Sequence, residues 1–144
     1  MANLSPILTV GLVGCSKTKL DRPAPARELY CSDLFRNAAE YCAHAYDAWY
    51  VLSARYGLLD PETNIEPYDL TLNAMSRPAQ RAWADSVYYE MSRAGLLSGK
   101  IYFHAGLAYR RFLIDRIDRC FVPLAGLGIG KQLAWYKSRG PARD

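Results

Sequence analysis

The feature that most constrains this chain is a short apolar run, "ILTVGLV" (Ile7–Val13), which passes directly into "GCSKTK". Such a run, rich in β-branched residues and almost uninterrupted, is typical of a strand buried on both faces. Three further segments are also short, apolar or aromatic, and bounded by charged or turn residues: Trp49–Ser53, Lys100–His104 and Arg119–Pro123. We therefore predict about four strands.

Helical patterns occupy the intervals between these strands. One pattern starts after Ser32, a suitable N-cap, and runs to Ala45, while a second starts after Ser76 and stops at Gly95. Two more helices are predicted over Leu107–Ile117 and Lys131–Arg139. Alternating strands and helices imply right-handed crossovers and a mostly parallel sheet covered on both faces. The prediction is a small three-layer α/β/α domain that spans residues 1–144 as a single unit.

Three segments do not fit this alternation. The stretch Ala54–Met75 contains two prolines and no sustained helical period, so we predict a structured loop beside the functional site. The segment Arg22–Arg27 is predicted to be an extended connector, and Arg139–Asp144 a frayed tail.

Composition limits the class of protein. A chain of 144 residues, 51% of them hydrophobic, can bury one core, but no apolar run approaches the ~18 residues of a membrane span. Residues 1–6 lack a secretory signal, so we expect a cytoplasmic protein with no membrane partner. The four cysteines form no C-x-x-C pair and are expected to be reduced thiols. The 18 basic against 14 acidic residues permit phosphate binding without requiring it, and the oligomeric state is left open.

Small, hydroxyl-bearing and cationic residues follow each predicted strand. In an open parallel sheet, ligands bind beyond the carboxyl ends of the strands, where these loops converge. We therefore predict a site for a polar ligand at this edge. Its candidate residues are Gly14, Cys15, Ser16 and Lys17 after the first strand, Ser53, Arg55, Tyr56 and Gly57 after the second, His104 and Gly106 after the third, and Gly128 and Lys131 after the fourth.

Each motif at this edge has more than one interpretation. "GCSK" lacks P-loop spacing, so Ser16 and Lys17 form either a short anion cradle or an ordinary turn with a solvated lysine. Cys15 is either a buried structural thiol or a nucleophile. The glycines near Gly128 let a backbone approach a phosphate, but their G-x-G-x-G spacing is not the dinucleotide fingerprint, and we predict no cofactor.

Two further side chains carry possible chemistry. His104 is either a hydrogen-bonded structural residue or a general acid or base. Asp69, in the segment "PYDL", is either a solvated loop acid or a carboxylate presented beside Tyr68. Cys42 and His44 are two residues apart on a predicted helix and do not share a face, so we predict no metal site.

Several motifs together indicate a family. "GCSKTK", "LYCSDLF", "LSARYGLLDPETNIEPYDLTL", "HAGLAYRRFL" and "LAGLGIGKQLAWY" resemble a small group of uncharacterised bacterial and phage proteins that is distantly similar to the YaaA peroxide-stress proteins. The third block is the most specific match. The resemblance implies a connection with DNA binding and protection against oxidative damage. A cysteine-serine followed by lysine, shared with archaeosine-type base-modifying proteins, implies nucleobase handling.

The leading hypothesis is an enzyme that acts on a nucleotide or a nucleic-acid base, by N-glycosidic bond cleavage or base transfer. In this hypothesis Asp69 stabilises positive charge on the sugar, and His104 or a water protonates the leaving base. The predicted binding residues hold phosphate or sugar (Ser16, Lys17 and the glycines after Leu124), stack the base (Tyr56 and Tyr68) and fix its edge (Arg55).

Two alternatives belong to other classes of protein. The basic residues of "YRRFLIDRIDR" fit a non-catalytic nucleic-acid-binding protein with DNA as a candidate partner. The same residues also fit a solvated helix face. A thiol redox protein that uses Cys15 is the second alternative.

Overall fold

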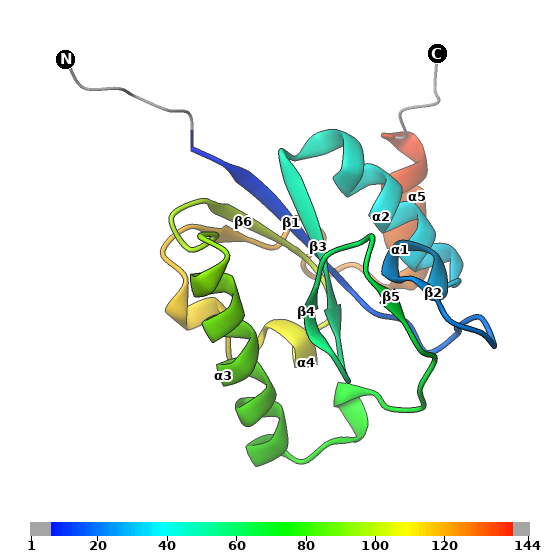
Figure 1. Ribbon diagram of the computed structural model, residues 1–144. Helices are drawn as coiled ribbons and strands as arrows, with labels where there is room; N and C mark the ends of the chain where they lie inside the picture. The colour runs from blue at the N-terminus through cyan, green and yellow to red at the C-terminus, as the bar shows by residue number, and fades with distance from the viewer. Residues whose placement is uncertain (1–6, 140–144) are drawn as a thin grey trace.

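The computed structural model describes residues 7–139, which form a five-stranded sheet of order β4-β3-β1-β6-β7 and a separate two-stranded ribbon of β2 and β5 (Figure 1). The strands are β1 (Thr9–Gly14), β2 (Ala24–Pro25), β3 (Ala48–Ser53), β4 (Gly57–Leu59), β5 (Asn64–Ile65), β6 (Lys100–His104) and β7 (Cys120–Phe121). The helices are α1 (Ala26–Leu29), α2 (Asp33–Ala45), α3 (Arg77–Arg93), α4 (Leu107–Arg110) and α5 (Ile129–Ser138), with 3-10 turns at Leu72–Ala74 and Ile114–Arg116.

All four predicted strands are present and parallel to one another. The strand β1 pairs in parallel with both β3 and β6, and β6 pairs in parallel with β7. The fifth strand, β4, was not predicted; it turns back from β3 and pairs with it antiparallel. The turn uses Gly57, whose φ of 75° lies in the left-handed region that favours glycine. The sheet is therefore mostly parallel, as expected, with one added antiparallel edge strand.

The two faces of the sheet carry two separate cores. Along β1, Val10 and Leu12 pack on the side of α3, while Val13 packs on the opposite side with α2. This alternation follows from the two-residue period of a strand. Figure 1 shows α3 on one side of the sheet and the neighbouring helices α2 and α5 on the other. The three-layer α/β/α prediction is confirmed.

The two long helices begin where the sequence predicts. Ser32 Oγ accepts a hydrogen bond from the Phe35 amide at 3.1 Å, and Ser76 Oγ accepts one from the Ala79 amide at 3.2 Å. Each hydroxyl satisfies an amide that the first helical turn leaves unpaired. Both N-caps are confirmed.

The predicted helix over Leu107–Ile117 is wrong. The chain leaves the helix after Arg110 and forms a separate 3-10 turn at Ile114–Arg116. Leu113 is fully buried between the two, so the chain turns inward to pack against the sheet instead of continuing a surface helix. In this segment the burial of Leu113 in the core determines the backbone conformation, although the sequence has a helical periodicity.

Other boundaries differ less. The segment Ala54–Met75 is more regular than a loop, since it contains β4, β5 and a 3-10 turn, and Arg22–Arg27 contains β2 and the start of α1. The last helix, α5, begins at Ile129 rather than Lys131, and the predicted tail lies outside the described residues beyond position 139.

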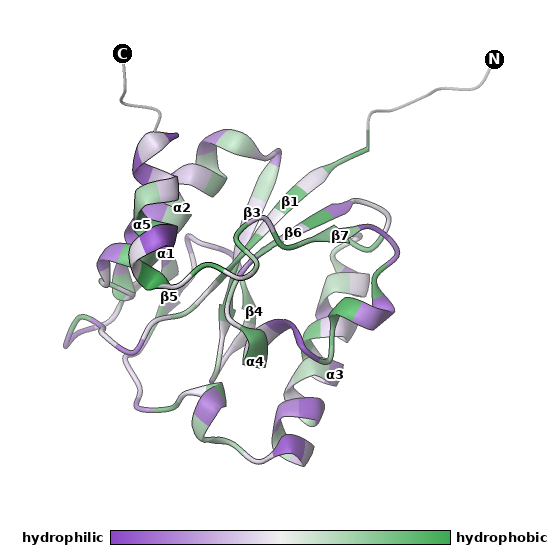
Figure 2. Cartoon of the chain, turned by 180° about the vertical axis from the view of Figure 1, so that it is seen from behind, coloured by the Kyte–Doolittle hydropathy of each residue, from purple (hydrophilic) through white to green (hydrophobic). Residues whose placement is uncertain are grey.

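The distribution of hydropathy follows these layers. Figure 2 shows pale to green colours along much of β1 and β6, and purple segments along α3. None of the helices within residues 7–139 is long and apolar enough to cross a lipid bilayer.

Candidate functional site

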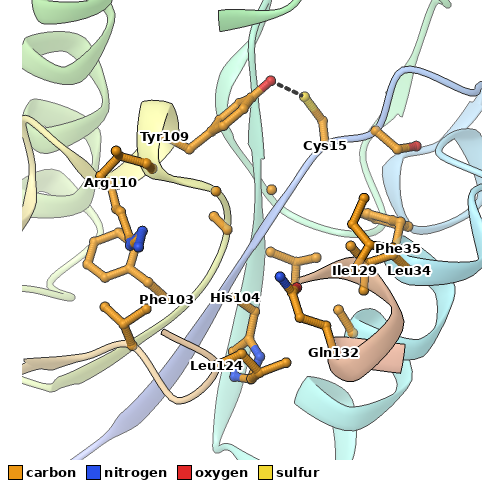
Figure 3. Close-up of a pocket in the computed structure, with 18 of the residues that line it drawn as sticks. Cys15, Leu34, Phe35, Phe103, His104, Tyr109, Arg110, Leu124, Ile129 and Gln132 are labelled. Atoms are coloured by element: carbon orange, nitrogen blue, oxygen red, sulfur yellow. Dashed lines mark hydrogen bonds between the residues drawn. The ribbon is translucent and has the colours of Figure 1, made fainter. Parts of the chain in front are cut away.

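A cavity of about 510 Å³ lies at the carboxyl ends of β1 and β6 (Figure 3). The strands β3 and β4 lie on one side of β1, and β6 and β7 lie on the other, so the strand order reverses at β1. Open α/β sheets bind ligands at such a reversal, because the flanking loops leave the sheet in opposite directions. Here the two loops come close: a Cβ on Gly14 would lie 3.1 Å from Ala105 Cβ. Gly14 therefore lets the chain after β6 approach the end of β1 closely, because a side chain at this position would crowd Ala105.

The cavity has two chemically different walls. Figure 3 shows Leu34, Phe35 and Ile129, from α2 and α5, across the cavity from Tyr109 and Arg110 of α4. The first wall is mainly apolar and also carries the amide of Gln132, whereas the second adds a hydroxyl and a guanidinium to the ring of Phe103. Small-molecule sites usually combine an apolar wall with a few polar groups in ~300–1,000 Å³. The cavity fits that description in both size and lining.

Cys15 reaches the cavity from the loop after β1. Its Sγ lies 3.3 Å from the Tyr109 hydroxyl, and either atom can donate the hydrogen bond. Burial, and secondarily the neighbouring Cys15, raises the pKa of Tyr109. The phenol therefore keeps its proton at neutral pH and is available as a donor. The structure thus places a half-buried thiol and a protonated phenol together at the cavity.

His104 lines the cavity, but its ring nitrogens are both engaged. Nε2 lies 2.7 Å from the Tyr46 hydroxyl, and Nδ1 lies 2.7 Å from the Tyr136 hydroxyl. A neutral imidazole suits this arrangement, because one nitrogen accepts and the other donates. Burial lowers the pKa of His104 to about 4, so the ring is neutral at pH 7. This geometry favours the structural interpretation of His104, and its role as an acid stays a prediction.

Arg110 is the least satisfied polar side chain of the cavity. Its guanidinium makes no hydrogen bond and no ion pair with any residue in the range 7–139, and its Nη1 is buried without a partner. Buried nitrogen donors in folded proteins nearly always have an acceptor. Figure 3 shows the guanidinium beside Phe103, within the α4 wall.

The predicted site residues divide into three groups. Cys15, Ser16, His104 and Gly106 line the cavity, as predicted for neighbouring strand ends, and Gly128 lies between lining residues at the start of α5. A second group is exposed and outside the lining: Lys17, Arg55, Asp69 and Lys131. The structure therefore does not bring Lys17, Asp69 and His104 into one cavity.

The third group lies at the end of β3, outside the cavity lining, and consists of Ser53, Tyr56, Gly57 and Tyr68. Ser53 and Tyr68 form a hydroxyl cluster there with Tyr30, which the sequence interpretation had not singled out. The Tyr30 and Tyr68 hydroxyls lie 2.7 Å apart, and Ser53 Oγ lies 3.1 Å and 2.9 Å from them, respectively. Burial raises the pKa of Tyr30 to about 12. Ser53 Oγ also accepts from the amide of Tyr56 at 3.0 Å, just before Gly57. The hydroxyls of this cluster are hydrogen-bonded to one another, and none of these residues lines the cavity.

The sequence interpretation missed most of the cavity walls. Tyr109 and Arg110 follow a predicted strand end by only a few residues, in "HAGLAYRR", so proximity to His104 was an available signal. Phe35 and Gln132 lie within helices, and only the packing of α2 beside α5 brings them to the cavity. Gln132 Nε2 donates to the Leu127 carbonyl at 2.8 Å, which fixes the side chain at the cavity edge.

Metal ligands are not clustered in the described chain: between residues 7 and 139, no three or more His, Cys, Asp or Glu side chains lie where they could hold one ion. The lining itself contains thiol, hydroxyl, amide and guanidinium groups, which suit an organic or anionic ligand better than a cation.

Comparison with known proteins gives one match. The model of a family of unknown function (DUF6884) matches residues 10–138. No curated protein and no solved structure matches the chain significantly.

Proposed function

Because the chain belongs to the DUF6884 family, whose function is unknown, we propose a function from the cavity itself: the protein is an enzyme that binds a nucleotide or nucleobase at the carboxyl ends of β1 and β6. The observation that carries this proposal is the cavity of about 510 Å³ at the reversal of strand order, with one apolar and one polar wall. Its position is the one at which doubly wound sheets bind nucleotides.

A nucleotide matches the two walls of the cavity. A flat base can pack on the apolar wall of Leu34, Phe35 and Ile129, since aromatic and aliphatic contacts accept any base. The sugar and its substituents then face Cys15 and Ser16 on the loop after β1. A wholly apolar or wholly charged ligand would leave one of these walls unmatched.

The reaction we propose is N-glycosidic bond cleavage or base transfer. In cleavage, one water adds its oxygen to C1′, the bond from C1′ to the base nitrogen breaks, and the base leaves with a proton. Tyr109 and Cys15 are the hydrogen-bonded proton carriers that face the cavity, and we assign proton delivery to this pair. In transfer, an incoming base replaces the water.

Two earlier assignments are kept only in a weaker form. A role for Asp69 at the sugar requires a ligand that extends beyond the cavity, because Asp69 is exposed and does not line it. The resemblance of "LSARYGLLDPETNIEPYDLTL" to YaaA-type sequences supports a nucleic-acid or nucleotide connection and stays a prediction, as does a DNA partner.

The test incubates the purified protein with ribo- and deoxyribonucleotides and measures free base by chromatography. We expect base release that falls about 100-fold in Tyr109→Phe and in Cys15→Ser, because general-acid groups contribute roughly 10² or more to rate. The matched controls are Tyr89→Phe and Cys31→Ser, which alter the same residue types away from the cavity lining.

The possible outcomes separate the three hypotheses. Asp69→Asn with unchanged release would remove Asp69 from the mechanism. Salt-sensitive binding of DNA without release of any base would contradict the enzymatic proposal and favour the nucleic-acid-binding alternative. Selective oxidation of Cys15 without nucleotide binding would favour the thiol redox alternative.

A further inference from the structure

We infer that the ligand of this cavity carries a phosphate or an equivalent oxyanion and that Arg110 binds it. The inference rests on the proposed function and narrows it: the ligand is a nucleotide rather than a nucleoside or a free base.

The first argument is the unpaired state of the guanidinium. Four ion pairs between residues 7 and 139 involve Arg22, Arg27 or Arg116, and none involves Arg110. Its Nη1 is buried without any acceptor. A charged donor that lacks both water and a protein partner lowers the stability of the fold. Arg110 as a whole is half-buried, so an acceptor in the cavity removes that deficit when the side chain turns to expose Nη1.

The second argument is the charge of the cavity. Its lining within the described chain contains Arg110 and no Asp or Glu, so the charged side chain of the lining is a cation. Ser16 and Gly106 border the same space. A guanidinium presents several N–H groups in a planar fork that matches two oxygens of a phosphate or carboxylate. The lining therefore favours an oxyanion over a neutral ligand.

The third argument is the separation of the two walls. Figure 3 places Arg110 across the cavity from Leu34, Phe35 and Ile129. A ligand that satisfies both walls has an anion at one end and a flat apolar group at the other, which is the layout of a nucleoside monophosphate. The phosphate end contacts α4, and the base contacts α2 and α5.

Calorimetric titration of the full chain with AMP, GMP, CMP and UMP, and with the four corresponding nucleosides, tests this inference. We expect the best nucleotide to bind at least about 10-fold more tightly than its nucleoside, since hydrogen bonds to charged groups are the strong ones. Arg110→Gln should weaken nucleotide binding about 10-fold to 100-fold and leave nucleoside binding unchanged.

The matched control is Arg111→Gln, which removes the same charge one residue along the chain at a position that does not line the cavity. It should bind the nucleotide as the wild type does. Arg110→Lys keeps the charge but loses the fork and should fall between wild type and Arg110→Gln. Thermal unfolding of each variant verifies that the fold is retained. If Arg110→Gln does not fold, the Arg110→Lys affinity and the nucleotide-to-nucleoside ratio of the wild type carry the test.

The outcomes distinguish this inference from the function beneath it. Equal affinity for nucleotides and nucleosides, unaffected by Arg110→Gln, overturns the phosphate inference while the nucleobase function stands. Binding of neither class overturns both. Stabilisation by inorganic phosphate in the wild type but not in Arg110→Gln, without any response to nucleotides, supports the anion site and overturns the nucleotide function.

Discussion

The two basic side chains that line the cavity, His104 and Arg110, differ in how completely they are hydrogen-bonded. On one side, His104 has a tyrosine hydroxyl within 2.7 Å of each ring nitrogen. On the other, the buried Nη1 of Arg110 has no acceptor. Paired polar groups in a low-dielectric interior add stability, whereas unpaired ones reduce it unless a ligand completes them. From this difference we expect His104 to stabilise the fold and Arg110 to bind a ligand, although both side chains line the same cavity.

The largest expected effect is on the fold, at His104. His104→Ala removes the imidazole, opens a hole and leaves the Tyr46 and Tyr136 hydroxyls without their partner. We expect the free energy of unfolding to fall by about 4 kcal/mol. Urea denaturation measures it, with the exposed His44→Ala as control, expected to change stability by less than about 0.5 kcal/mol. A loss at His104 no larger than at His44 would contradict the structural role.

The next effect is the pH dependence of stability. The pKa of His104 lies near 4 in the folded protein, against 6.5 as its ordinary value, so the unfolded chain takes up the proton first as the pH falls. The neutral ring therefore contributes fully above pH ~6.5, and about 3 kcal/mol is lost between pH 6.5 and 4.

Urea denaturation of wild type and His104→Gln across this range measures the difference directly. The stability gap between the two proteins should shrink as the pH falls, because glutamine does not titrate. A gap that stays constant from pH 7.5 to 4 would show that the ring nitrogens are not held neutral by the fold.

The smallest expected effect is the change in stability when Arg110 is replaced. Arg110→Met keeps the length of the side chain and removes the unpartnered charge, so stability should stay constant or rise by about 1 kcal/mol without ligand. Thermal and urea unfolding measure this, with Arg111→Met as the neighbouring control. A loss above about 1 kcal/mol in Arg110→Met alone would mean that the guanidinium supports the fold and is not reserved for a ligand.

Much of the fold was predictable from local chemistry. The four parallel strands have continuous apolar segments, and Ser32 and Ser76 are hydroxyl caps directly before amphipathic helices. These signals depend on neighbours within a few residues. The end of α4 after Arg110 was not predictable in this way, because the buried position of Leu113 depends on contacts with distant strands and helices.

The candidate site was predictable only along the strand ends. Cys15 and Ser16 follow β1, His104 ends β6 and Gly106 follows it, and these residues meet because the two strands are neighbours. Ser53, the last residue of β3, also lies at a strand end but belongs to the hydroxyl cluster instead, because Tyr30 and Tyr68 cover that strand end. Closeness to a strand end therefore predicts that a residue lies at this edge of the sheet, but it does not predict whether the residue lines the cavity.

Local sequence signals were sufficient to predict the class of fold and the edge of the sheet at which the cavity lies, because strand burial and helix capping depend on residues close together in the chain. Only the tertiary structure decided which polar side chains are paired with one another and which face the cavity. Pairing depends on distances between segments as far apart as Tyr46, His104 and Tyr136, and packing alone sets those distances.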